Sequence, residues 1–191
     1  MTRGGTGSGR SAAEIGEGRA GPRCGSALRI VGIDPGLASV GYGVIEAENG
    51  RIRHLAHGCV ETAAAEPMGR RLLEIFGAVA DLIETWEPDL AGMESLYFAR
   101  NVSSALPVAE AKGVIRLAFA RAGVALAEYP PNALKQAVTG SSRAEKEQVQ
   151  EMVRVLLGLS ERPRPDHAAD ALAAAICRFH HQGPLDTTRS L

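Results

Sequence analysis

Several features that would assign a protein to a particular class are scarce in this sequence of 191 residues. Aromatic residues make up only 4% of it, so the hydrophobic core must be built from aliphatic side chains. No apolar run approaches the roughly 18 residues that a membrane-spanning helix needs. The first residues contain no apolar segment of signal-peptide type. These absences predict a cytoplasmic protein.

Cysteine is scarce as well. Cys24, Cys59 and Cys177 form no Cys-x-x-Cys pair and leave an odd number. This pattern indicates reduced thiols and argues against a structural zinc site.

The composition predicts one folded domain between two tails. Residues 1–27 are rich in Gly, Ser and Arg and contain too little apolar surface to form a core, so we expect a disordered N-terminal tail. Residues 28–183 suit a single domain, and residues 184–191 are expected to form a flexible C-terminal tail.

The net charge of -1 does not indicate a nucleic-acid-binding protein, but the charges are unevenly distributed along the chain. Between Leu28 and Glu94 there are 5 basic and 11 acidic residues, whereas between Ser95 and Pro165 there are 10 basic and 6 acidic ones. An acidic segment followed by a basic one is compatible with carboxylates that bind a metal beside a surface that meets phosphate. Ordinary variation of surface charge accounts for the pattern nearly as well.

Hydrophobic periodicity predicts an α/β domain with a mixed five-stranded sheet. Three antiparallel strands come first, with Asn49-Gly50 as a hairpin signal, and helices then alternate with two further strands. Strands are expected at residues 28–34, 40–46, 51–62, 89–94 and 124–128, and helices at residues 68–86, 105–121, 130–135, 142–158 and from 166 onward. This order favours a single sheet with helices on both faces.

Two helix starts carry specific signals. Ser104 is the expected N-cap of the second helix. Ser142-Arg-Ala-Glu145 matches a capping box in front of the fourth helix.

Two carboxylates stand out by position. Asp34 and Glu94 each end a strongly apolar strand, where a charge is costly to bury without a partner. Carboxylates at the ends of strands in one sheet can converge, and they repel each other unless one is protonated or a cation lies between them. A hard divalent ion with oxygen ligands meets that requirement. Two solvent-facing residues at strand ends are the simpler alternative.

The last helix adds further candidate ligands. In Asp166-His-Ala-Ala-Asp170, both Asp166 and His167 share a helix face with Asp170. Asp166 has a structural explanation, because an acidic residue in the first turn complements the helix dipole. Asp170 lies beyond that turn, beside small apolar residues, and is the better ligand candidate.

An ordered set of motifs between Leu28 and about His180 resembles the RuvC family of Holliday-junction resolvases. These motifs are Gly32-Ile-Asp34-Pro-Gly36, Gly41-Tyr-Gly-Val-Ile45, Met93-Glu94 with Asn101 and Ser104-Ala-Leu106, Val138-Thr-Gly140, Ala144-Glu-Lys146 with Gln148-Val-Gln150, and His167-Ala-Ala-Asp170-Ala-Leu172. A single strand-Asp-Gly motif would be weak, because actin-like and sugar-kinase ATPases share it. The complete set is specific.

The resemblance implies a ribonuclease-H-like fold and four catalytic, metal-binding positions, which fall on Asp34, Glu94, His167 and Asp170. It also implies phosphodiester hydrolysis with two divalent ions, Mg²⁺ or Mn²⁺, per active site. The commonest family pattern has aspartate where this sequence has His167, although some members carry histidine there. Asp166, one residue earlier, is the alternative ligand, and the spacing to Asp170 favours His167. Because imidazole is a softer ligand than carboxylate, we expect Mn²⁺ to be preferred.

The resemblance further implies DNA contacts and partners. Lys135 and Lys146 match basic family positions, and Tyr97 matches an aromatic position near the junction bases, where stacking on an unpaired base is expected. Arg100 and Lys112 are expected to add phosphate contacts, as is Arg116. The expected partners are four-way junction DNA, a second copy of the chain in a homodimer, and branch-migration proteins of the RuvA and RuvB type.

Other functions fit the sequence less well. His54 and His57, three residues apart on a strand, are expected to point to opposite faces and so cannot share a metal. The glycines between Gly36 and Gly43 are followed by no Gly-Lys-Ser/Thr sequence, which excludes a Walker loop. The remaining alternative is a ribonuclease-H-like module that binds nucleic acid without cutting it.

Overall fold

The structure is a computed structural model, and it describes residues 27–95 and 102–181. Five strands and five helices follow one another in the predicted order. The strands are β1 (Leu28–Asp34), β2 (Ser39–Glu48), β3 (Arg51–Glu61), β4 (Leu90–Glu94) and β5 (Ala125–Tyr129); the helices are α1 (Met68–Trp86), α2 (Val102–Ala122), α3 (Pro131–Thr139), α4 (Lys146–Leu156) and α5 (Asp166–His180).

The strands form one mixed five-stranded sheet, as predicted, and their order in it is β3-β2-β1-β4-β5. The pairs β1–β2 and β2–β3 are antiparallel, whereas β1–β4 and β4–β5 are parallel. The C-terminal ends of β1, β4 and β5 therefore lie at the same edge of the sheet.

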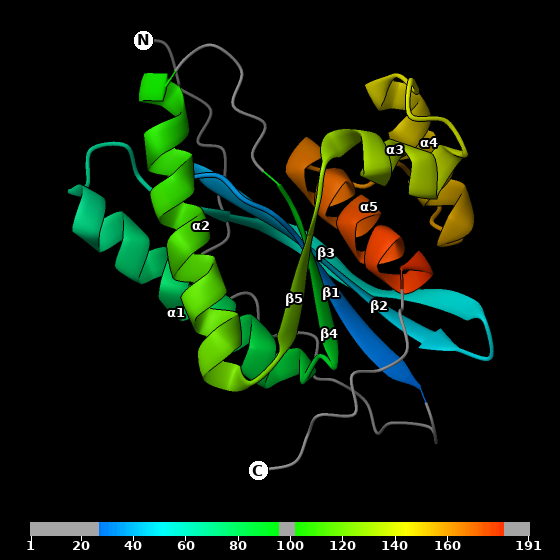
Figure 1. The fold of residues 1–191 in the computed structure, drawn as a ribbon, viewed down its shortest axis with the longest axis horizontal. Coiled ribbons are helices and arrows are strands. Elements are labelled where there is room, and N and C mark those ends of the chain that lie inside the picture. The colour runs from blue at the N-terminus through cyan, green and yellow to red at the C-terminus, as the bar shows by residue number, and fades with distance from the viewer. Residues whose placement is uncertain (1–26, 96–101, 182–191) are drawn as a thin grey trace, which may run out of the picture.

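Helices cover both faces of the sheet (Figure 1). Helices α1 and α2 lie on one face over a hydrophobic cluster that includes Val31, Ile33 and Phe119. Helices α3, α4 and α5 lie on the other, where Ile30 and Ile45 contribute to a second cluster. In the described part of the chain, no helix is long and apolar enough to cross a membrane.

Helix α5 packs unusually close to the sheet. Its residues from Ala171 to Cys177 are all buried, and five of these seven are Ala or Cys. Small strand residues make the approach possible: a Cβ atom at Gly32 would lie 1.9 Å from the Ala171 carbonyl oxygen, and one at Gly41 would lie 2.1 Å from that of His167. These glycines thus fix how deeply the start of α5 sits against β1 and β2.

Two predicted helix starts are wrong in detail. Helix α2 begins at Val102, so Ser104 lies within the helix rather than at its N-cap. The capping box of α4 is formed by Glu145 and Gln148, not by Ser142 and Glu145. The Glu145 N–H donates to the Gln148 Oε1 atom at 2.9 Å, which satisfies a donor that the helix leaves free.

The prediction for His54 and His57 is also wrong. The register of β3 against β2 shifts between Val44 and Ile45, which places an extra residue, Leu55, in β3. A bulge of this kind breaks the simple alternation of faces. The two rings consequently meet, with His54 Nε2 2.8 Å from His57 Nδ1.

Candidate metal-binding active site

Asp34 and Glu94 lie at the ends of neighbouring parallel strands. The register pairs Ile33 of β1 with Met93 of β4, so the next residue of each strand is one of the two acids. Both acids point to the face that α5 covers, because Gly32 and Gly92, two residues earlier in each strand, contact α5 there. The strand ends therefore bring the two carboxylates together, as the sequence predicted.

Helix α5 adds His167 and Asp170 to these strand ends. The Nδ1 atom of His167 lies 2.6 Å from the Oδ2 atom of Asp34, although the two residues are 133 positions apart. The Asp34 side chain is only 13% exposed, whereas that of His167 is 52% exposed. Because an ionised carboxylate can only accept, this contact fits a proton on Nδ1, and in the corresponding neutral tautomer the lone pair is on Nε2.

Two of these carboxyl groups, those of Glu94 and Asp170, have raised pKa values. The pKa of Glu94 rises from 4.5 to about 7, first because the group is partly buried and then because Asp34 and Asp170 lie nearby, and Lys112 partly opposes the rise. Burial raises the pKa of Asp170, with repulsion from Asp34 as the next cause. Such a group of carboxylates favours either a shared proton or a bound cation.

The donor set suits a divalent cation in its chemistry. Three carboxylates supply hard oxygen ligands, and His167 supplies a neutral nitrogen. Within residues 27–95 and 102–181, no three acidic, histidine or cysteine side chains already converge at ligating distance. Binding an ion would thus require some of these side chains to rotate toward one another.

Lys146 lies beside these acids, at the first residue of α4. Its Nζ atom is 3.0 Å from Asp166 Oδ2 and 3.7 Å from Asp170 Oδ2. The Asp166 side chain is 65% exposed, and Gln150 also donates a hydrogen bond to it. The hydrogen bond from Lys146 is the main reason why the pKa of Asp166 is lowered. Of the two alternative ligands, His167 is therefore the one that contacts Asp34, while Asp166 pairs with a lysine at the rim.

Lys112 does not fit its predicted role as a phosphate contact. It is only 2% exposed and lies on α2, across the sheet from α5. Its ammonium group donates to the Glu94 carbonyl oxygen and to Glu128. The helical pattern alone could not show whether Lys112 points outward or into the core.

The other residues predicted to contact DNA differ in their surroundings. Lys135 lies on α3, partly buried, and its side chain forms no hydrogen bond or ion pair with any residue that the structure describes. Arg116 is paired with Glu128. Tyr97 and Arg100 lie outside the described residues.

Sequence reasoning missed Glu128. It lies in β5 opposite Met93 of β4 and accepts hydrogen bonds from both Lys112 and Arg116. The signal for it was present, because β5 is a third parallel strand with an acidic residue near its C-terminal end.

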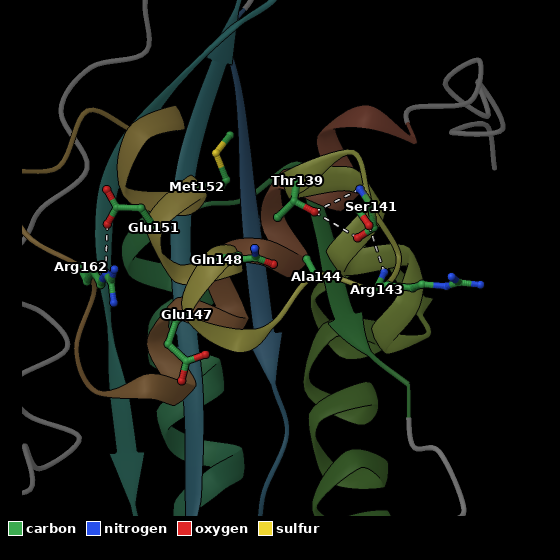
Figure 2. Close-up of a pocket in the computed structure, with 9 residues that line it drawn as sticks. All are labelled: Thr139, Ser141, Arg143, Ala144, Glu147, Gln148, Glu151, Met152 and Arg162. Atoms are coloured by element: carbon green, nitrogen blue, oxygen red, sulfur yellow. Dashed lines mark hydrogen bonds and ion pairs between the residues drawn. The ribbon is translucent and has the colours of Figure 1, made fainter.

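Two surface cavities lie near α4. One of about 580 Å³ is lined by residues of α4 and the loop before it, and the ion pair between Glu151 and Arg162 closes one side (Figure 2). It includes none of the four predicted ligands. The other, of about 750 Å³, is lined by the connector before α5 and by Gln150, Asp166 and His167, so it borders the acidic site.

Comparison with known proteins gives consistent matches over the folded part of the chain. The family described as crossover junction endodeoxyribonuclease RuvC matches residues 30–178. A protein of that description from Treponema denticola is 54% identical over 151 residues, which are 79% of this chain and 85% of the relative. Another from Moorella thermoacetica is 52% identical over 150 residues, 78% of this chain and 90% of the relative.

Solved structures agree. Thermus thermophilus RuvC superposes with a TM-score of 0.74 at 37% identity, covering 80% of this chain and 93% of that one. The structure of T. thermophilus RuvC in complex with Holliday junction substrate gives a TM-score of 0.73 at 35% identity, with the same coverage.

Proposed function

Because the chain belongs to the RuvC family of crossover junction endodeoxyribonucleases, we propose that it is a metal-dependent endonuclease that resolves four-way DNA junctions in recombination and repair. One observation carries the proposal beyond family membership. Asp34, Glu94 and Asp170 come from three separate elements, yet across one end of the sheet Asp34 raises the pKa of both other carboxyl groups, and Asp170 raises that of Glu94. His167 is in direct contact with this group.

The four side chains divide the work of phosphodiester hydrolysis. These residues would hold two divalent ions, whose chemistry would be to activate the attacking water and to stabilise the leaving oxygen. Asp34 is proposed as the central metal ligand, because it lies on the central strand β1 with Glu94 on one side and His167 on the other. Glu94 and Asp170 complete the oxygen ligands. His167 keeps its Nε2 atom for ligation or for accepting a proton, while Asp34 holds its ring in place.

The neighbouring cations are proposed to bind the DNA backbone. Lys146 pairs with acids at the rim of the site and is half exposed, so a phosphate brought to the site can replace those partners. Lys135, Tyr97 and Arg100 remain proposals for further contacts with phosphate and with unpaired bases.

We also propose a homodimer that works in the cytoplasm with branch-migration proteins of the RuvA and RuvB type. A four-way junction has approximate two-fold symmetry and needs two nicks, which a pair of identical sites provides. The helices on the face away from the site support this arrangement, because Leu73 of α1 and Leu106 and Leu117 of α2 are 58–60% exposed. Exposed leucines of this kind favour burial against another chain.

Substrate selectivity tests the proposal. The protein is incubated with Mn²⁺ and either a synthetic four-way junction or a linear duplex of the same sequence. We expect paired nicks in the junction and little cutting of the duplex. Equal cutting of both would indicate a general nuclease, and tight junction binding without nicks would indicate the binding module.

A further inference from the structure

Lys112 of α2 is a buried cation that ties two strand ends together. It is 2% exposed, and its Nζ atom lies 3.1 Å from the main-chain oxygen of Glu94 and 2.8 Å from Oε2 of Glu128. Glu94 ends β4, and Glu128 lies one residue before the end of β5. A buried ammonium group is retained only where its hydrogen bonds are satisfied, so these contacts are specific.

A second cation keeps Glu128 in place. Arg116, one helical turn after Lys112, donates from Nε to Oε1 of Glu128 at 2.6 Å. Burial alone would raise the pKa of Glu128, but the hydrogen bonds from Arg116 and Lys112 outweigh it and lower the pKa. Glu128 thus stays ionised and gives Lys112 a fixed anchor.

The two sides of Glu94 have opposite surroundings. Its side chain faces α5 together with two other carboxylates, which repel it once it is ionised. Its carbonyl oxygen receives the ammonium group of α2 from the other side of the sheet. Beyond it, the Ser95 N–H donates to the Tyr129 carbonyl oxygen at 2.8 Å, which adds a second tie to β5.

We propose that Lys112 is a positioning residue for the active site: it holds the end of β4 from behind, so that the Glu94 carboxylate stays where a divalent ion needs it. The inference rests on the proposed function, because it takes Glu94 as a ligand. Lys112 has no part in DNA binding in this account, since its ammonium group is buried and already has two partners.

Three variants test this role. Lys112→Met removes the charge and the hydrogen bonds but keeps the aliphatic stem, and Lys112→Arg restores a cationic donor. Arg116→Met is the matched control, because it removes the other partner of Glu128 without touching Glu94. Mn²⁺ binding to the metal-free protein is measured by electron paramagnetic resonance of the free ion, and junction binding is measured without metal.

We expect Lys112→Met to weaken Mn²⁺ binding by roughly 10–100-fold, the usual effect of removing a group that orients a metal ligand. Junction affinity should stay within about two-fold of wild type, since a phosphate contact is not lost. Lys112→Arg should recover most of the Mn²⁺ affinity. Arg116→Met should cause a much smaller loss than Lys112→Met, because it loosens Glu128 but leaves the hydrogen bond from Lys112 to the Glu94 carbonyl oxygen intact. Unchanged Mn²⁺ binding by a folded Lys112→Met protein overturns the inference, as does an equal loss in Arg116→Met or a parallel loss of junction affinity.

Folding is checked by circular dichroism and urea unfolding. If Lys112→Met does not fold, Glu128→Gln takes its place: it weakens the anchor of Lys112 and should reduce Mn²⁺ affinity in the same direction, and unchanged affinity overturns the inference. If wild-type protein itself binds no Mn²⁺, the proposed function fails rather than the role of Lys112.

Discussion

Glu94 offers the sharpest test of the electrostatics of the site, because its ionised form is disfavoured in the metal-free protein. A pKa that rises from 4.5 to about 7 corresponds to roughly 3–4 kcal/mol before solvent screening, at 1.36 kcal/mol per pKa unit. Glu94 is only partly buried and solvent screens its neighbours, so about 2 kcal/mol is the better expectation. Glu94→Gln removes the charge and should therefore stabilise the metal-free protein at pH 8.

The sign follows from proton binding. Between pH 4.5 and about 7 the unfolded chain has already released the Glu94 proton while the folded protein keeps it, so the free energy of unfolding falls as the pH rises through this range. At pH 4 both states are mainly protonated, and Glu94→Gln should differ little from wild type there. At pH 8 the variant should gain about 2 kcal/mol, or roughly 4–8 °C in Tm for a domain of this size.

The assay is urea and thermal unfolding in a chelator at pH 4 and pH 8. Glu74→Gln is the matched control, because Glu74 is exposed on α1 and forms no hydrogen bond or ion pair with the described residues; its effect should stay within about 0.5 kcal/mol. Added Mn²⁺ should stabilise wild type at pH 8 more than Glu94→Gln. A gain of equal size at both pH values, or a loss of stability at pH 8, would refute the reasoning.

Three further predictions concern the metal, the DNA and the packing of α5. Wild type should be more active in Mn²⁺ than in Mg²⁺, and His167→Asp should reduce that preference, because it replaces a nitrogen ligand by oxygen; a metal titration in which wild type is fully active in Mg²⁺ and gains nothing from Mn²⁺ contradicts the expectation. Lys146→Met should weaken junction binding and reduce the slope of log Kd against log salt by about 1, as measured by fluorescence anisotropy; an unchanged slope argues against a phosphate contact. Gly32→Ala should destabilise the fold by about 3 kcal/mol or more, since the new Cβ would meet the Ala171 carbonyl oxygen at 1.9 Å. The control, Gly69→Ala on α1, meets no atom within 4 Å and should stabilise by roughly 0.5–1 kcal/mol in urea unfolding.

The strand ends show what the sequence could predict. Asp34 and Glu94 each follow a short apolar run, and parallel neighbours must bring such ends to one edge, so both the elements and their convergence were predictable. The spacing to Asp170 favoured His167 over Asp166 as a metal ligand, but only weakly. The choice between them depends on the depth of α5 against the sheet, which the close approach at Gly41 determines.

Features that depend on the exact placement of one residue could not be predicted from the hydrophobic pattern of the sequence. The bulge at Leu55 joins His54 and His57 because of pairing with β2, and no property of β3 alone indicates it. The helical pattern around Lys112 fits an exposed side chain as well as a buried one. Its burial is explained by its partner Glu128, on a strand 16 residues later. Local rules predicted the elements here, while contacts between residues far apart in the sequence determine which side chains meet.

One group of side chains is proposed to cut the junction while other residues bind it. Wild type and Asp34→Asn are compared on a labelled four-way junction, with binding recorded without metal and cleavage recorded with Mn²⁺. We expect Asp34→Asn to bind the junction within about two-fold of wild type but to cut it at least about 10³-fold more slowly, because a central ligand is lost. Cleavage by Asp34→Asn at the wild-type rate would contradict this proposal.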